Sequence, residues 1–488
     1  MLRVHNDRTH QVEEFAPQTP PRVAMYTCGP TVYNLSHLGH AKCYVSWDVV
    51  HRYLEYRGFD VTMAVNFTDV DDKIIHRAQE EGEDWRSLAE RYTREYLADM
   101  DALNIRRADL YPKATEHIPE MIAHIEGLIA NGHAYPSGGD VYYAVESFPH
   151  YGELSGRTLE QMQAGARVEV DEKKRHPMDF ALWKGAKPGE PYWDSPWGPG
   201  RPGWHIECSA MARKHLGDTL DIHTGGLDLT FPHHENEIAQ SEGLTDHTFA
   251  RYWFHNGFVT VNAEKMSKSL GNFETLRDLF KTYDPQTVRY FLLLGHYRQE
   301  VDFSDEGLVA ARTGLSRLRK SLARFKDALA PETPGVAELE RSIEASFVAA
   351  MDDDFNTPKG IASLFEAAKA IADLPPADAP AAGHAVAQVY ALGEVLGLDL
   401  ATLPPENRDL ADVAEGLSRL ADTHGVPGAQ AEEWLTGLIS ARTQAKANKQ
   451  WAAADGIRDG LKALGIALMD RPGGETAWER VEPVAAGR

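Results

Sequence analysis

Cysteine is scarce in this chain, which has only Cys28, Cys43 and Cys208 among its 488 residues. Three scattered cysteines exclude the dense disulfide framework of a small secreted domain, so we expect free thiols or metal-bound thiolates in a reducing compartment. Long apolar runs are also missing, and the polar stretch Met1–Gln11 lacks the apolar segment of a secretory signal. We therefore expect a cytoplasmic protein that does not enter a membrane.

Positive charge is in short supply as well, because 50 lysines and arginines stand against 73 aspartates and glutamates. A chain with a formal net charge of -23 cannot hold nucleic acid by bulk attraction alone, so a polyanionic partner must meet local basic patches. The acidic excess lies before residue 432, since basic and acidic residues are equal in number from there to residue 488. With 43% hydrophobic and 25% charged residues, the chain is neither disordered nor fibrous and has room for several globular domains.

The hydrophobic pattern near the N-terminus predicts an α/β fold with a parallel sheet. Val23–Thr27 is a short apolar strand candidate, and the apolar residues that follow have helical spacing up to Gly58. From Phe59 to Val65 the apolar residues alternate, as in a second strand. A strand, a helix and a strand within this length predict a βαβ unit with a right-handed crossover, whose ligands gather at the carboxyl ends of the strands.

The rest of the chain divides into segments of different character. Residues 110–200 predict an insertion, with a helix near His117–Ile129, a hairpin over 133–147, and loops rich in proline, glycine and tryptophan. Strand candidates return at Leu220–His223 and Trp253–Val261.

Beyond about residue 310 the pattern is helical, with Thr357 and Pro358 at the cap and first turn of one helix and a proline-rich loop over 373–383. A last small unit begins near Glu432. We therefore predict a Rossmann-type domain over 1–310 with an insertion over about 110–200, a helical bundle domain over 311–425, and a small C-terminal domain over 430–488.

The tetrapeptide His37-Leu38-Gly39-His40 lies between the first predicted strand and its helix. Free backbone amides and the helix dipole favour a phosphate at such a helix start. Two imidazoles three residues apart could donate to the same anion. A role in capping the helix remains open, because a chain with 21 histidines can contain so short a string by chance.

A second motif, Lys265-Met266-Ser267-Lys268-Ser269, follows the last predicted strand in a polar loop bounded by Gly271. It presents two ammonium groups and two hydroxyls together, which suits a leaving pyrophosphate, although a solvated surface loop is the alternative. No P-loop string competes for a nucleotide. In this order and at this separation, the two motifs resemble the signature pair of the class I aminoacyl-tRNA synthetases.

A third group of polar residues contains candidate metal ligands. His233 and Glu237 stand at i and i+4 on one helical face, and Cys28 and Cys208 could complete a tetrahedral, thiolate-rich site. Spacing alone leaves zinc open, because the chain has no C-x-x-C pair and the two cysteines are far apart in sequence. Cys43 has the spacing of a core residue.

The stretches YTCGPTVYNLSHLGHAK, NFTDVDDKI, GWHIECSAMA and FPHHENEIAQSE resemble the cysteinyl-tRNA synthetase family, and the resemblance covers essentially the whole chain. It implies one Zn²⁺, ligated by the substrate thiolate and held by Cys28, Cys208, His233 and Glu237. It implies a cysteine pocket formed by Gly29, Thr68, Trp204 and His223. It implies ATP binding with Mg²⁺ at His37, His40, Gly225, Asp228 and Lys268, and catalytic roles for His37, His40, Lys265 and Lys268.

A metal suits the selection of cysteine on chemical grounds. An apolar pocket would distinguish cysteine from serine or alanine by only ~10 to 200-fold. A thiolate bond to zinc uses a softness that a hydroxyl lacks. The insertion, roughly a hundred residues long, is too short for an editing domain.

The C-terminal unit carries the features of an RNA-binding surface. Arg442, Lys446 and Lys449 form a basic stripe at helical spacing, and Trp451 begins the next predicted helix. An exposed aromatic beside such a stripe suits an unstacked base, whereas the alternative is that Trp451 caps a small core. The resemblance implies tRNA contacts by Arg442, Lys446, Trp451 and Asp455 in an anticodon-binding end. Lys446 stands where the family leads us to expect arginine, and a lysine loses the bidentate fork.

The resemblance implies a cysteine–tRNA ligase whose partners are ATP, L-cysteine and tRNA(Cys), with no obligate protein partner evident. One alternative is the related cysteine ligase of mycothiol biosynthesis, which couples cysteine to an amino sugar and lacks an anticodon-binding end. Another is a catalytically inactive RNA-binding zinc protein, which the intact HLGH and KMSKS motifs disfavour.

Overall fold

The computed structural model describes residues 1–165, 172–261, 264–265, 275–403, 410–470 and 476–480. The chain forms two compact units, residues 1–402 and 403–488. Residues 410–425, which we expected in the helical domain, belong to the second unit. No helix in the described ranges has both the length and the apolar character needed to cross a membrane.

A four-stranded parallel sheet forms the centre of the first unit and confirms the predicted α/β class. Its order is β10 (Ala250–Asn256), β9 (Leu220–Gly226), β3 (Arg22–Thr27) and β4 (Asp60–Val65). The register pairs Thr27 with Val65 and with Thr224, so the carboxyl ends of these strands meet at one edge. Ligands bind at that edge in open parallel sheets.

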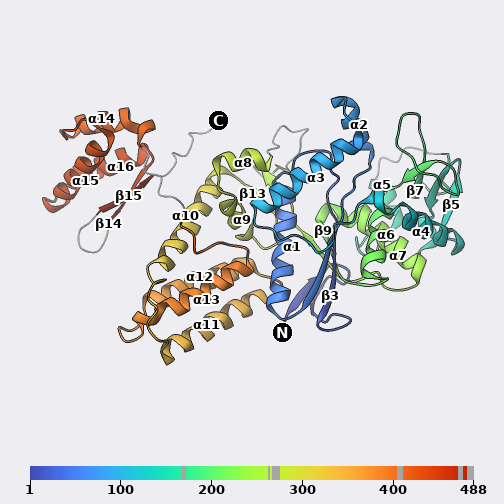
Figure 1. Cartoon of the computed structure of the whole chain (residues 1–488), viewed down its shortest axis with the longest axis horizontal. Coiled ribbons are helices and arrows are strands. Elements are labelled where there is room, and N and C mark those ends of the chain that lie inside the picture. Colours follow the sequence, from blue (N-terminus) through green and yellow to red (C-terminus); the bar gives the residue numbers. More distant parts are fainter. Residues whose placement is uncertain (166–171, 262–263, 266–274, 404–409, 471–475, 481–488) are drawn as a thin grey trace. The chain divides into compact units, whose positions relative to one another are not determined.

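Helix α1 (Leu38–Tyr56) connects β3 to β4 and packs against the sheet (Figure 1). It also contacts α9 (Pro285–Leu293) and α13 (Ala382–Val395), so 14 of its 19 residues are buried. The sequence pattern indicated one apolar face. The structure differs because a helix enclosed by the sheet and two other helices needs apolar residues on several sides.

The predicted insertion forms a second sheet, antiparallel, of β5 (Ala134–Ser137), β6 (Asp140–Tyr143), β7 (Phe180–Gly185) and β8 (Gly200–Pro202). The expected hairpin over 133–147 is β5 and β6. Its two-residue turn, Gly138-Gly139, has φ of +61° and +84°, which glycine adopts without strain and which matches the twist of a hairpin. Helices α4 (Ile118–Ala130) and α5 (Leu159–Gly165) belong to the same insertion.

The predicted strand Trp253–Val261 is two strands, so this prediction was wrong in its extent. Strand β10 ends at Asn256, and β11 (Val259–Val261) pairs with β12 (Glu264–Lys265) and β13 (Val301–Phe303) in another sheet. The break falls at Gly257, where an added Cβ would lie 2.5 Å from backbone atoms of Gln299. Only glycine allows the two chain segments to approach so closely.

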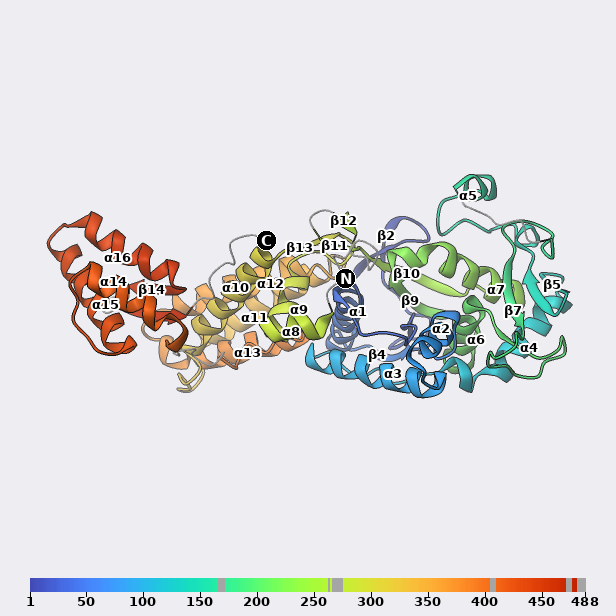
Figure 2. The ribbon, with the colours of Figure 1, turned by 90° about the horizontal axis from the view of Figure 1, so that it is seen from above.

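Some helices of the first unit cover the sheet, and others lie beyond it on the side away from the insertion (Figure 2). The helix predicted near Thr357 is α12, whose cap is Asn356, one residue earlier than expected, because Asn356 Oδ1 accepts from Lys359 N–H at 3.2 Å. The remaining helices are α2 (Asp72–Glu81), α3 (Trp85–Ala102), α6 (Trp204–Leu216), α7 (Glu235–Thr245), α8 (Leu276–Thr282), α10 (Asp305–Ala323), α11 (Pro334–Met351) and α12 (Thr357–Ala372). A hairpin of β1 (Arg3–Asn6) and β2 (Gln11–Glu14) precedes the sheet.

The second unit is a small helical domain with its own core. Its described elements are α14 (Ala414–Thr423), α15 (Ala431–Ala447), α16 (Trp451–Ala463), β14 (Ile466–Asp470) and β15 (Thr476–Arg480). Leu417, Leu435, Leu438 and Leu461 are each at most 1% exposed and form the centre of that core.

Candidate functional site

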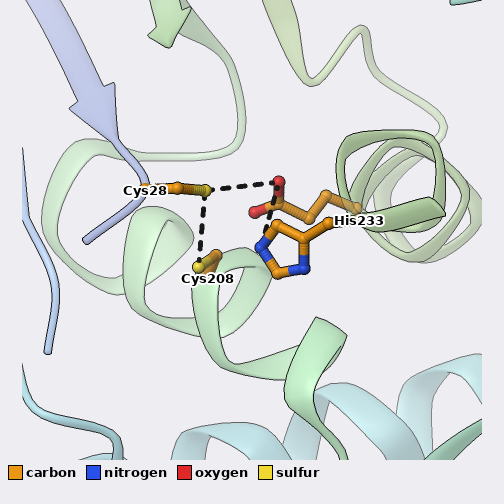
Figure 3. A group of neighbouring side chains, drawn as sticks. Cys28, Cys208 and His233 are labelled. Atoms are coloured by element: carbon orange, nitrogen blue, oxygen red, sulfur yellow. Dashed lines mark hydrogen bonds and ion pairs between the residues drawn. The ribbon is translucent and has the colours of Figure 1, made fainter. Parts of the chain in front are cut away.

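The four candidate metal ligands come together at the carboxyl edge of the parallel sheet. Cys28 directly follows β3, and Cys208 lies in the second turn of α6. His233 comes from the short helical segment Thr230–His234, which runs into α7, where Glu237 lies in the first turn. Figure 3 shows Cys28, Cys208 and His233 pointing toward one another from three separate segments.

The distances within this cluster are those of a tetrahedral metal site. Cys28 Sγ lies 3.7 Å from Cys208 Sγ and 3.8 Å from Glu237 Oε2, and His233 Nε2 lies 3.8 Å from the same carboxylate oxygen (Figure 3). Bonds to zinc of about 2.0 to 2.3 Å in a tetrahedron require ligand atoms about 3.3 to 3.8 Å apart. All four ligand atoms lie within 4.8 Å of one another.

The side chains of the cluster have almost no contact with solvent, since each is at most 4% exposed. Burial raises the pKa of the Cys28 thiol well above its ordinary value and raises that of Cys208 to about 11. Burial lowers the pKa of His233 to about 3, so the imidazole is neutral and can offer a lone pair. Burial alone would raise the pKa of Glu237, but His223 and His233 hold it below its usual value.

This donor set fits a soft divalent cation. Two sulfurs, one imidazole nitrogen and one carboxylate oxygen are the ligand types that zinc accepts in a tetrahedral site. A second combination, Cys28, His223, His234 and Glu237, also brings its ligand atoms within 4.8 Å. It contains one sulfur, and His223 Nε2 lies 3.3 Å from Glu237 Oε1, at hydrogen-bonding distance. The first combination therefore fits zinc better.

The residues expected to form a cysteine pocket all lie beside this cluster. Gly29 follows Cys28, and an added Cβ there would lie 1.5 Å from the backbone oxygen of Asn66, so no other residue fits. Thr68 donates to Glu207, the neighbour of Cys208, at 2.6 Å.

Aromatic rings form the other wall of the same region. Trp204 stacks on His233 with 4.2 Å between ring centroids and is 37% exposed, so part of the ring faces solvent. His223 is fully buried and lies with Nε2 3.2 Å from Glu237 Oε2.

His37 and His40 cap helix α1, as one of the two open interpretations proposed. The Nδ1 atom of His37 accepts from Gly39 N–H at 3.0 Å, and that of His40 accepts from His37 N–H at 3.2 Å. Burial and the neighbouring His37 lower the pKa of His40 well below its ordinary value. A neutral imidazole that accepts at Nδ1 carries its proton on Nε2, so capping also orients an Nε2–H donor.

The other residues that we expected to bind the nucleotide lie in different surroundings. Gly225, the residue before the last of β9, lies against the ring of His234, since an added Cβ would lie 2.7 Å from that ring. Asp228, on the exposed segment after β9, lies close enough for its charge to act on Cys43 of α1. Lys265 ends β12, and Lys268 lies outside the described residues.

The expected tRNA-contacting residues divide into exposed and enclosed ones. Trp451 begins α16 and is 58% exposed, which excludes the interpretation that it caps the small core. Asp455 is exposed and pairs with Arg458 at 3.0 Å. Arg442 is only 8% exposed.

The predicted basic stripe is therefore shorter than expected. Lys446 lies in the last turn of α15 and is partly exposed. Lys449 has a φ of +59° and follows the end of the helix, so it does not continue the stripe.

Several polar residues at the site were missed by sequence reasoning. The side-chain oxygen of Asn66 accepts from Gly29 N–H at 2.8 Å, and His205 Nδ1 lies 2.9 Å from His233 Nδ1. Tyr26 lies opposite His223 in the pairing of β3 with β9. Tyr26, Asn66 and His205 all belong to the quoted strings and were available as signals, but the place of Tyr26 beside His223 depends on the pairing of β3 with β9.

Comparison with known proteins shows the family of the chain. Residues 14–313 match the family of class I (C) tRNA synthetase catalytic domains, and residues 346–401 match the DALR domain. The chain is 51% identical over 493 residues to the cysteine–tRNA ligase of Pelotomaculum thermopropionicum, covering 98% of this chain and 100% of that protein. It is 50% identical over 481 residues to the cysteine–tRNA ligase of Shewanella loihica, with coverage of 98% and 100%.

Solved structures share the fold at low sequence identity. Methionyl-tRNA synthetase of Mycobacterium tuberculosis bound by methionyl-adenylate has a TM-score of 0.57 and 16% identity, covering 77% of this chain and 92% of that one. The Agrobacterium radiobacter LeuRS in its ternary complex has a TM-score of 0.56 and 11% identity, covering 81% and 86%.

The parallel sheet, the histidine motif at the start of α1 and the matched catalytic domain define a class I aminoacyl-tRNA synthetase. Identity of about one half over nearly the full length gives the finer assignment. The chain belongs to the cysteine–tRNA ligase family.

Proposed function

We propose that this chain activates L-cysteine with ATP to cysteinyl adenylate and transfers the cysteinyl group to the 3′ end of tRNA(Cys). The observation that carries the proposal is the buried cluster of Cys28, Cys208, His233 and Glu237 at the carboxyl edge of the parallel sheet. The full-length similarity to cysteine–tRNA ligases supports it.

We assign a zinc ion to this cluster and Mg²⁺ to the bound ATP. Zinc bound there would supply a Lewis acid with affinity for the cysteine sulfur as a thiolate, a ligand that neither serine nor alanine can offer. Cys28, Cys208, His233 and Glu237 hold the ion. Gly29, Thr68, Trp204 and His223 surround the amino acid, and the close packing at Gly29 keeps the chain near the pocket free of a side chain.

The reaction is an in-line attack of the cysteine carboxylate on the α-phosphate of ATP, with pyrophosphate as leaving group. His37 and His40 donate from Nε2 to phosphate oxygens, in the orientation that their capping hydrogen bonds set. Gly225 and Asp228 contribute to the nucleotide site, and Lys265 and Lys268 stabilise the departing pyrophosphate. Catalysis of this kind consists mainly of positioning and charge stabilisation.

The second unit and the helices that precede it bind the tRNA in this proposal. We assign the catalytic domain to residues 1–310, tRNA-binding helices to about 311–402, and anticodon recognition to the second unit. Trp451, Lys446 and Asp455 are exposed or partly exposed there and can meet RNA directly. Arg442 is nearly buried, so its expected contact is with the phosphate backbone at most.

Two assays on the purified chain test the proposal. Cysteine-dependent exchange between ATP and pyrophosphate should be detected and should fall when zinc is removed by a chelator and return when it is restored. Charging of tRNA(Cys) should follow. Exchange without tRNA charging, together with transfer of cysteine to an amino sugar, would instead identify a sugar ligase.

A further inference from the structure

A buried hydroxyl lies next to the candidate metal cluster with no partner in hydrogen-bonding geometry. Tyr26, in β3 two residues before Cys28, is fully buried. Within the described part of the chain, no group meets both the distance and the angle of a hydrogen bond with its hydroxyl, and the side chain that acts on it most directly is Cys208. Buried polar groups are nearly always hydrogen-bonded in folded proteins, so an orphaned hydroxyl needs an explanation such as a missing ion.

The surroundings of this hydroxyl are the cluster itself. Burial raises the pKa of Tyr26 well above its ordinary value, and the next contributions come from the charges of Cys208, Cys28 and Glu237, in that order. The phenol ring packs edge-on against His223 at 5.4 Å between ring centroids. The hydroxyl is therefore close to three of the four proposed zinc ligands.

The loaded cluster has a surplus of negative charge. A zinc ion brings two positive charges, whereas Cys28, Cys208 and Glu237 as ligands bring three negative ones, and His233 is neutral. The thiolate of a bound cysteine adds a fourth. Because the site is almost closed to water, protein hydrogen-bond donors must offset this charge.

The hydrogen-bond donor observed at the cluster binds the carboxylate of Glu237 and not a sulfur. Glu237 accepts from His223 Nε2 at 3.3 Å. On the sulfur side, the amide oxygen of Asn66 lies 3.6 Å from Cys208 Sγ, but it is an acceptor whose orientation is fixed by Gly29 N–H.

We propose that Tyr26 is a positioning residue whose hydroxyl donates a hydrogen bond to the Cys208 thiolate when the metal is bound. Removing part of the negative charge from Cys208 strengthens metal binding and allows the ion to accept one more thiolate, that of cysteine. This inference rests on the proposed zinc site.

Cobalt binding to the full-length chain tests the proposal by spectroscopy. In Tyr26→Phe, the sulfur-to-cobalt charge-transfer absorption should move to lower energy, because a thiolate without its hydrogen bond gives up an electron more easily. Affinity for Co²⁺ should fall by about tenfold, as is typical when a group that supports a metal ligand is lost. An unchanged band energy with unchanged affinity would overturn the proposal.

Tyr44→Phe is the matched control. Tyr44 is also buried, but its hydroxyl donates to the backbone oxygen of Cys28 at 3.3 Å and not to a sulfur. Its removal should leave the charge-transfer band in place. An equal shift in both variants would show that the effect is not specific to a thiolate donor and would overturn the assignment to Tyr26.

Thermal unfolding with and without Zn²⁺ separates this role from a structural one. Without metal, Tyr26→Phe should unfold at the same temperature as the unaltered chain or higher, because it removes an unpaired buried hydroxyl. With Zn²⁺, it should gain less stability than the unaltered chain. An equal decrease of the unfolding temperature with and without Zn²⁺ would refute the proposal. If the unaltered chain itself bound Co²⁺ without thiolate absorption, the proposed zinc site would be wrong.

Discussion

At the scale of single residues, the candidate metal site buries two thiols and a carboxylate close together, where their negatively charged forms are unfavourable without a cation. The thiols of Cys28 and Cys208 have raised pKa values because they are buried together beside Glu237. Such a cluster gains stability from a cation that allows both thiols to ionise, since metal binding releases their protons. Ligand identity at this position should therefore determine metal content and cysteine binding together.

The variant Cys208→Ser should lose zinc and cysteine activation in parallel, because a hydroxyl is a poor ligand for zinc. We expect metal affinity to fall by at least about 100-fold, more than is typical for loss of a supporting group. Metal analysis after dialysis and pyrophosphate exchange measure the two effects. Cys43→Ser, which alters a thiol that accepts from Trp47 outside the cluster, is the control. Full zinc occupancy with normal cysteine affinity in Cys208→Ser would exclude Cys208 as a ligand.

Sequence reasoning found the site residues whose side chains are chemically distinctive and stand in recognisable strings, namely Cys208, His233 and the histidines before α1. It did not find Tyr26, because a tyrosine in an apolar strand looks like a core residue. Only the pairing of β3 with β9, which places Tyr26 opposite His223, turns that position toward the site. Such placement depends on strand order, which a single sequence does not specify.

At the scale of elements, the two histidines at the start of α1 cap the helix and, in the proposed reaction, also donate to phosphate. His37 is the cap of α1, and the ring of His40 closes the capping box. The two rings stack with 3.8 Å between centroids. The earlier alternatives of helix cap and phosphate donor are therefore compatible, because the capping bonds use Nδ1 of each ring and phosphate donation uses Nε2.

Two substitutions of His37 separate these roles. Asparagine is a good helix cap and alanine is a poor one, so His37→Ala should lose about 1 kcal/mol of stability and His37→Asn much less. Both lack the Nε2–H donor, so single-turnover adenylate formation should slow by about 100-fold in both. If His37→Asn formed adenylate at the normal rate, His37 would be only a cap.

The insertion is joined to helix α7 by a buried histidine. His124 of α4 is 2% exposed, and its Nε2 lies 3.0 Å from the backbone oxygen of Gln240 in α7. Burial lowers the pKa of His124 from 6.5 to about 4. The folded chain therefore binds a proton here less readily than the unfolded chain, so the contribution to stability is present above pH 6.5 and is lost as pH falls toward 4.

The variant His124→Gln, which keeps an N–H donor and does not titrate, should remove this dependence on pH. Between pH 7 and 4, the free energy of unfolding of the unaltered chain should fall by about 3 kcal/mol more than that of the variant. Hydrogen exchange in α4 and α7 measures the difference locally. Parallel pH profiles for the two proteins would contradict the prediction.

The element boundaries show where sequence patterns were sufficient and where packing decided. The two strands and the end of the helix of the first βαβ unit were predicted to within one or two residues, because their apolar periodicity was strong, whereas α1 begins at Leu38, inside the motif that was expected to precede it. The extent of Trp253–Val261 was wrong because Gly257 allows a close crossing that periodicity does not reveal. The basic stripe of α15 was too long because Lys449 lies beyond the helix end.

At the scale of the whole molecule, a buried ion pair joins helix α1 to the helical part of the first unit. Arg289 of α9 is fully buried and pairs with Asp48 of α1 at 2.5 Å. Its Nε donates to the backbone oxygen of Leu396, just after α13. The catalytic sheet and helices α9 to α13 therefore form one unit through α1, and this unit ends at Thr402.

The boundary between the two units is the position at which a truncation should separate cysteine activation from transfer to tRNA. Leu396, Leu398 and Leu400 are at most 2% exposed and belong to the core of the first unit, so a chain ending at Thr402 keeps that core. A cut near Glu432, which the sequence alone suggested, would instead leave α14 without the helices it packs against.

Deletion of residues 403–488 should leave cysteine-dependent pyrophosphate exchange near normal while charging of tRNA(Cys) falls strongly, because the lost contacts orient only the tRNA. Trp451→Ala in the full chain should have the same pattern more mildly, by ~1 to 3 kcal/mol if a base stacks on the exposed indole. The kcat/KM values for pyrophosphate exchange and for tRNA charging, compared between variant and unaltered chain, measure how far each reaction is affected. Asp422→Asn, at the exposed end of α14 away from Trp451 in sequence, is a control that should charge tRNA normally. Normal charging by the truncated chain would show that the second unit does not read the tRNA.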